Sequence, residues 1–123
     1  MEVTIESFGF KYGAPQGYDL TFDVRFLPNP FYIEELTQLN GKNQKIRDFV
    51  LGYDASVMFL SKLNNLLEFL IPTYEQKGNE SLRIGIGCTG GKHRSVALAE
   101  ELFFSLQKLE VKVIIHHRDV ERG

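Results

Sequence analysis

The sequence predicts a single α/β domain in which a small, mostly parallel β-sheet carries helices on its faces. A short apolar run over 82–87 is followed by a helical pattern over 95–109 and by a run rich in β-branched residues over 111–115. Strand, helix and strand in this order form a βαβ unit, whose strands are parallel and whose crossover is right-handed. The chain has 123 residues, the length of one domain with one core, so we assign residues 1–123 to a single domain.

Two further strands are expected near the start of the chain, over 3–8 and 20–26, because both segments alternate in side-chain type. The segment 9–18 contains three glycines and a proline, which predicts a loop between them. Alternate residues of a strand point to the same side. Asp23 and Arg25 therefore form a charge pair on one face, near the end of the second strand.

Helices are expected between the second and third strands. The turn 27–31 contains two prolines and cannot continue a strand, because proline has no N–H donor. A weak helical turn over 33–39 and a short helix over 43–51 follow. Asp54 is a suitable N-cap for a longer helix, which Pro72 kinks or ends. The apolar stripe of this helix contains Phe59, Leu63, Leu66, Leu67 and Leu70.

The last helix, over 95–109, has a buried side that contains Leu98, Leu102, Leu106 and Leu109. In open parallel sheets, ligands bind beyond the carboxyl ends of the strands. The loop 88–94 follows the third strand, and residues 116–118 follow the fourth. We therefore expect these two segments to lie at the same edge of the sheet and to form a binding site.

The overall composition favours a soluble cytoplasmic protein. Hydrophobic residues make up 43% and charged residues 24% of the chain, and no apolar run is long enough to span a membrane. The first residues lack the pattern of a signal peptide, and a single cysteine excludes an internal disulfide. The formal net charge of -2 does not by itself indicate nucleic-acid binding.

The most informative segment of the sequence is the glycine-rich loop over 87–91, which is followed by Lys92, His93 and Arg94. A strand, a glycine-rich turn and a helix N-terminus present backbone N–H groups to an anion. The nucleotide P-loop requires glycine at position 86 and Ser or Thr at position 93. The sequence has Ile86 and His93 instead, so this P-loop is not expected here.

The segment 88–95 fits the pattern C-x-x-G-x-x-R-S and resembles the phosphate loop of protein tyrosine phosphatases. In such an enzyme Cys88 would be the nucleophile, Arg94 would clamp the phosphate oxygens, and Ser95 would assist departure of the thiolate. The general acid is not identified by the sequence, since Asp19, Asp23 and Asp54 are all candidates.

The other interpretation is a loop that binds phosphate without covalent chemistry. In that case Cys88 is a small buried residue, as most cysteines at strand ends are. A metal site is not predicted, because Cys88, His93, His116 and His117 do not have the spacing of a closed ligand set. No cofactor is predicted either.

Several separated motifs resemble the C-terminal domain of the RapZ and YvcJ family of RNase adapter proteins. They are GCTGGKHRSV at 87–96, FDVRFLPNPFY at 22–32, HRDVE at 117–121 and SFGFKYGAP at 7–15. The resemblance extends over nearly the whole chain. Family members also have an N-terminal P-loop domain that hydrolyses ATP or GTP, and this sequence contains no such region, so hydrolysis is not expected.

The resemblance implies a regulatory adapter domain rather than an enzyme. Domains of this family are associated with binding an amino-sugar phosphate, glucosamine-6-phosphate, with binding small regulatory RNA, and with self-association. We therefore expect a homodimer or larger assembly, and an RNase or another protein as a partner. The fold is similar to a subdomain of 6-phosphofructokinase.

The resemblance also implies a set of ligand-binding positions. Backbone N–H groups over 89–93 would bind phosphate and Arg94 would pair with its charge, while Asp23, held by Arg25, would accept a hydroxyl or amino group of the sugar. Lys92, Arg118 and Arg122 are the candidates for RNA phosphate contacts. The full set of ligand positions is Asp23, Arg25, Asn29, Cys88, Thr89, Gly90, Gly91, Lys92, His93, Arg94, Ser95, His117 and Arg118.

Overall fold

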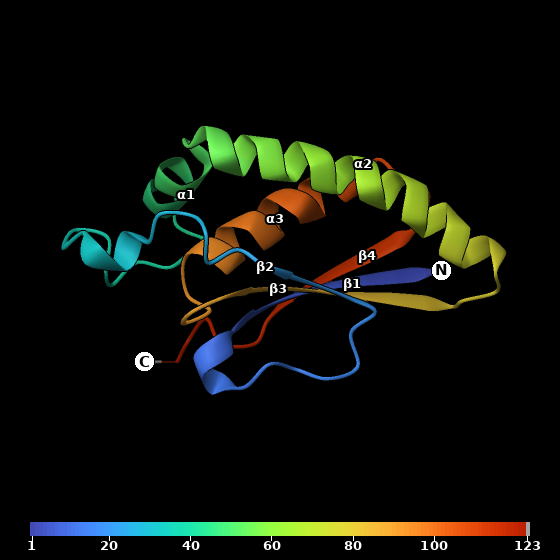
Figure 1. Cartoon of the computed structure of the whole chain (residues 1–123), viewed down its shortest axis with the longest axis horizontal. Coiled ribbons are helices and arrows are strands. Elements are labelled where there is room, and N and C mark those ends of the chain that lie inside the picture. The colour runs from blue at the N-terminus through green and yellow to red at the C-terminus, as the bar shows by residue number, and fades with distance from the viewer. Residues whose placement is uncertain (123) are drawn as a thin grey trace.

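The computed structural model, which describes residues 1–122, confirms the α/β class with a parallel sheet and flanking helices (Figure 1). The strands are β1 (Glu2–Gly9), β2 (Leu20–Asp23), β3 (Ser81–Cys88) and β4 (Lys112–His117). They form one sheet in the order β2-β3-β1-β4, and each neighbouring pair is parallel. β1 therefore lies between the two strands of the predicted βαβ unit.

The three helices are α1 (Gln44–Leu51), α2 (Asp54–Gln76) and α3 (Arg94–Leu106). All three lie on one side of the sheet (Figure 1). α3 packs directly against β1, β3 and β4, and α1 and α2 pack against α3. The opposite face of the sheet carries polar side chains such as Glu6 and Arg83, which need no covering helix.

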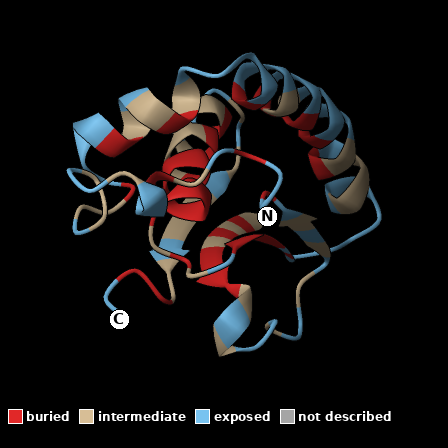
Figure 2. Ribbon diagram, turned by 60° about the vertical axis from the view of Figure 1, so that its left-hand side comes forward, coloured by how far each residue is buried: buried red, intermediate tan, exposed pale blue. Residues whose placement is uncertain are grey.

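The core lies between the sheet and the helices (Figure 2). The sheet contributes alternate residues that are fully buried, namely Val3, Ile5, Leu82, Ile84 and Ile86. α3 contributes Leu98, Leu102 and Leu106, as the sequence predicts. Burying these apolar side chains provides the main stabilisation of the fold.

The buried face of α2 differs from the predicted stripe. It consists of Leu60, Leu63, Leu67 and Ile71, together with Ser56. Leu66 is 41% exposed, and Phe59 and Leu70 are partly buried. Both sets follow helical spacing, but the observed buried face is rotated around the helix axis relative to the predicted stripe, toward Leu60 and Ile71.

Several predicted element ends are corrected by the structure. β2 ends at Asp23 because the N–H of Leu27 turns back to the carbonyl of Val24. Tyr53, not Asp54, is the N-cap of α2, and the helix continues past Pro72 to its end at Gln76. α3 ends at Leu106 rather than at position 109.

Two short 3-10 turns, η1 (Phe10–Tyr12) and η2 (Pro30–Tyr32), lie in the segments predicted as loops. Asn29 caps η2, because its side-chain oxygen accepts a hydrogen bond from the Phe31 N–H at 3.1 Å. Both turns follow the carboxyl end of a strand, so they lie at the same edge of the sheet as the glycine loop.

Within residues 1–122, no helix has the length and apolar content needed to cross a lipid bilayer.

Candidate functional site

The glycine loop begins where β3 ends, at Cys88, and leads into the first turn of α3 at Arg94. His93 occupies the N-cap position without making a side-chain cap. The first N–H groups of a helix have no partner inside the helix and carry a partial positive charge. The loop and helix start thus have the arrangement that the sequence predicts for anion binding.

Glycine is required in this loop because two backbone segments approach closely. A Cβ atom on Gly91 would lie 2.5 Å from the backbone nitrogen of Gly9, and a Cβ on Gly9 would lie 2.5 Å from the carbonyl carbon of Gly90. Gly91 also has a φ of 71°, which favours glycine. The N–H of Lys11 donates to the carbonyl of Thr89 at 3.1 Å, so the start of η1 is fastened to the loop.

A cavity of about 310 Å³ opens beside this loop, a volume suited to a small metabolite. Four of its lining residues are Lys or Arg and, within the part of the chain that the structure describes, none is Asp or Glu. The cavity wall is therefore electropositive. It is formed by Lys11, Tyr12, Asn29, Phe31, Tyr32, Thr37, Gln38, Cys88, Thr89, Gly90, Lys92, His93, Arg94 and Arg122.

Cys88 is 2% exposed and lines the cavity at the end of β3. Its Sγ lies 3.1 Å from the Oγ of Ser95, which is fully buried in the first turn of α3. This hydrogen bond joins the last residue of the strand to the start of the helix. The thiol thus contributes to the packing of the loop as well as to the cavity wall.

Arg94 is 4% exposed, and its guanidinium is largely committed to the backbone. Nη1 donates to the carbonyl oxygens of Arg25 and Leu27, at 2.9 Å each. Nη2 lies 3.4 Å from the Oγ1 of Thr89, and Nε is buried and has no hydrogen-bond partner within residues 1–122. Arg94 therefore fixes the turn after β2 and at the same time brings a positive charge to the cavity.

His93 is also buried, and its Nε2 lies 3.3 Å from the carbonyl oxygen of Thr37. Burial lowers the pKa of His93, so its ring is neutral at pH 7. The N–H of Gly41 donates to the carbonyl of Lys92 at 2.8 Å. These contacts hold the segment that carries Thr37 and Gln38 against the loop.

Asp23 and Arg25 form the predicted charge pair, with Arg25 Nη2 2.6 Å from Asp23 Oδ2. The hydrogen bond from Arg25 holds the pKa of Asp23 below its usual range. The guanidinium of Arg25 also stacks on the ring of Phe10 at 4.0 Å. Neither Asp23 nor Arg25 lines the cavity.

His117 lies between β1 and α3, away from the cavity. Its Nδ1 is 2.6 Å from Ser7 Oγ and its Nε2 is 2.8 Å from Glu100 Oε2. Burial lowers the pKa of His117. Among residues 1–122, no group of His, Cys, Asp or Glu side chains is arranged to hold a metal ion.

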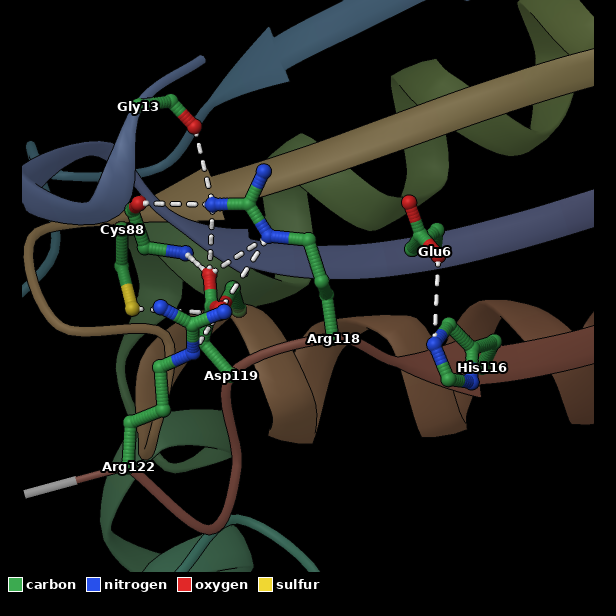
Figure 3. A network of polar contacts seen from close by, with 9 residues as sticks. Glu6, Gly13, Cys88, His116, Arg118, Asp119 and Arg122 are labelled. Carbon is green, nitrogen blue, oxygen red and sulfur yellow. Dashed lines mark hydrogen bonds and ion pairs between the residues drawn. The ribbon is translucent and has the colours of Figure 1, made fainter. Parts of the chain in front are cut away.

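The side chain of Arg118 binds backbone carbonyl groups and does not line the cavity. Its Nη2 donates to the carbonyl oxygens of Gly13, at 2.8 Å, and Gly9, at 3.3 Å (Figure 3). It also forms an ion pair with the fully buried Asp119 at 2.7 Å. This guanidinium therefore clamps the end of β1 and the turn that follows it.

The structure thus brings together only part of the predicted ligand set. The predicted residues that line the cavity are Asn29, Cys88, Thr89, Gly90, Lys92, His93 and Arg94. The predicted residues that lie behind or beside it are Asp23, Arg25, Gly91, Ser95, His117 and Arg118.

The sequence patterns do not place Lys11, Phe31, Thr37 or Gln38 at the site, and they suggest Arg122 only as an RNA contact. The order of the strands in the sheet is the feature that places Lys11 at the site. Lys11 follows the carboxyl end of β1, and β1 is the neighbour of β3 in the sheet. Residues at the carboxyl ends of neighbouring parallel strands share one edge.

Comparison with known proteins agrees with the motifs and the fold. The RapZ C-terminal domain family matches residues 1–121. The chain belongs to this family. The match covers the cavity-lining residues from Lys11 to Arg94, and Arg122 lies just beyond it.

Individual relatives of this RapZ C-terminal domain are longer proteins. A nucleotide-binding protein of Caldicellulosiruptor saccharolyticus is 53% identical over 122 residues, which cover 99% of this chain and 42% of the relative. Nucleotide-binding proteins of Thermoanaerobacter pseudethanolicus and Clostridium botulinum are 52% and 51% identical, over 96% and 98% of this chain and 42% and 41% of the relatives. The chain spans about two fifths of the length of these relatives, and the name nucleotide-binding protein is that of the whole relative.

The glycine contact predicts different effects for two neighbouring substitutions. Gly91→Ala places a Cβ against the backbone of Gly9 at a positive φ, and we expect it to lower the free energy of unfolding by at least about 1–3 kcal/mol. Gly90→Ala meets no atom within 4 Å, and we expect a change below about 0.5 kcal/mol. Urea denaturation followed by circular dichroism measures both. Equal effects would contradict the packing described.

Proposed function

We propose that this domain is a regulatory binding domain whose cavity holds a phosphorylated small molecule. The observation that carries the proposal is the cavity at the start of α3, lined by four Lys or Arg residues and by no Asp or Glu among the described residues. Phosphate binds to backbone N–H groups at helix N-termini and to nearby cations. Membership of the RapZ C-terminal domain family supports a binding role.

In this proposal the phosphate lies against the loop 89–93, and Arg94 and Lys92 balance its charge. An amino-sugar phosphate such as glucosamine-6-phosphate is the first ligand to test. Asp23 is unsuited to bind the amino group of this ligand, since the Asp23 carboxylate is paired with Arg25 outside the cavity. The uncharged side chain of Gln38 lines the cavity, and its carbonyl oxygen can accept hydrogen bonds from the amino or hydroxyl groups of the sugar.

A phosphatase is the weaker candidate, although the loop fits its pattern. The guanidinium of Arg94 would have to bind phosphate oxygens bidentately, yet Nη1 is already bound to two backbone carbonyls. A leaving group also needs a general acid. The three aspartates considered from the sequence, Asp19, Asp23 and Asp54, do not line the cavity.

We expect isothermal titration calorimetry to detect binding of inorganic phosphate and of glucosamine-6-phosphate. Lys92→Gln removes a cation from the cavity wall and should weaken both affinities about tenfold, the size of one charge-assisted hydrogen bond. Lys45→Gln removes an equal charge from the exposed side of α1 and should leave the affinities unchanged.

Absence of binding of either ligand at millimolar concentration would refute the proposal. The same protein samples can be assayed for phosphatase activity. Release of phosphate from glucosamine-6-phosphate that Cys88→Ser abolishes would favour the enzyme over the binding domain.

We also propose that the cavity edge contacts the phosphates of RNA, as an adapter of this family would. Lys11, Lys92 and Arg122 lie on this edge with two exposed aromatic side chains, Phe31 and Tyr32, the latter 82% exposed. Cations that track the backbone and aromatic rings that stack on bases are the elements of single-strand binding. Arg118 is a weaker candidate than the sequence suggested, because its guanidinium holds backbone carbonyls.

RNA affinity should fall steeply as the salt concentration rises, since each phosphate contact releases a counterion. Lys92→Gln should reduce the slope of log affinity against log salt by about one unit. Lys45→Gln again serves as the control. Filter binding with a structured small RNA measures the slope, and an affinity insensitive to salt would argue against this contact surface.

A further inference from the structure

Part of the cavity wall lies outside the glycine loop and carries its own cations. Lys11 and Tyr12 come from η1, after β1, and Arg122 comes from the turn after β4. The Nζ of Lys11 lies 5.1 Å from the centre of the Tyr12 ring, and the guanidinium of Arg122 lies 4.8 Å from the same ring. The electron-rich ring faces attract both cations and gather them at one place.

Arg122 is held from behind by a buried carboxylate. Its Nε lies 3.0 Å from Asp119 Oδ1, and Asp119 is fully buried (Figure 3). The other oxygen of Asp119 accepts a hydrogen bond from the Gly9 N–H at 2.7 Å. Asp119 therefore ties Arg122 to the end of β1 and fixes the position of its guanidinium at the cavity.

Arg118 and Arg122, which both bind Asp119, differ in the contacts of their remaining nitrogens. The Nη2 of Arg118 donates to backbone carbonyls of Gly9 and Gly13. For the side chain of Arg122, the polar and ring contacts in the described part of the chain are Asp119, through Nε, and the Tyr12 ring. The terminal nitrogens of Arg122 are therefore available to a ligand in the cavity, whereas those of Arg118 are engaged.

The positive charge on this side of the cavity is only partly balanced by nearby carboxylates. Asp119 is one negative charge beside the two guanidinium groups of Arg118 and Arg122. Lys11 and Lys92 form no ion pair within residues 1–122. Burial raises the pKa of Asp119, but the hydrogen bonds from Arg118 and Gly9 outweigh it, so the carboxylate stays charged and its pKa is lowered. Even so, positive charge remains in excess on this side of the cavity.

We propose that Lys11 and Arg122 form a second anion subsite beside the phosphate loop. The ligand class that fits is a small molecule with two anionic groups, a phosphate on the loop and a second phosphate or a carboxylate between Lys11 and Arg122. This proposal rests on the proposed function, because the first group occupies the phosphate site described above. Asp119 is the positioning residue of the second subsite, since it anchors Arg122.

The test compares sugar phosphates that differ by one anionic group. Calorimetry with fructose 1,6-bisphosphate and fructose 6-phosphate gives the gain in affinity from a second phosphate. The same measurement with 6-phosphogluconate and glucose 6-phosphate gives the gain in affinity from a carboxylate. We expect at least one gain of about tenfold or more. Arg122→Gln and Lys11→Gln should each remove most of that gain, measured in each variant as the ratio of its affinities for the diacid and for the monophosphate.

Lys62→Gln, on the exposed side of α2, is the matched control and should keep the gain. The subsite is wrong if neither diacid binds more tightly than its monophosphate partner, or if the gain persists in Arg122→Gln. In either case binding of glucosamine-6-phosphate would show that the phosphate site itself stands. If no sugar phosphate binds, both the subsite and the proposed function are refuted.

Discussion

The close contact between two backbone segments, the end of β1 and the loop after β3, determines the geometry of the whole cavity. Gly9 and Gly91 lie so near each other that neither position has room for a side chain. The N–H of Gly9 is then free of the sheet and donates to Asp119, and the next segment, from Lys11, donates to Thr89. This contact and these hydrogen bonds join β1, the loop after β3 and the turn over 118–122 into one unit.

The positive charges of the cavity depend on the same unit. Arg94 is held by carbonyls of the turn after β2, and Arg122 is held by Asp119. Hydrogen bonds of this kind fix the direction of long side chains before a ligand arrives, which lowers the entropy cost of binding. In the proposed binding site the cations are thus oriented in advance by the scaffold behind the cavity, and several residues of the sequence motifs belong to that scaffold.

Much of the fold and the central part of the site could be predicted from the sequence. The apolar run, the glycines and the helical stripe after them identify β3, the loop and α3, because each pattern has a direct local cause. Side-chain partners were harder to predict. Asp23 is captured by Arg25 two residues away, and His117 points to Glu100 on α3 because successive strand residues alternate between faces. The contribution of Lys11 depends on the order of the strands, which no local pattern reveals.

The central claim is that phosphate binds to the backbone N–H groups between β3 and α3. Nuclear magnetic resonance measures this directly, by following backbone amide resonances during a titration with inorganic phosphate. The account predicts that the largest shifts occur over residues 89–94, with the amides of α2 unchanged. Saturable shifts confined to other parts of the molecule, with those of 89–94 unmoved, would contradict it.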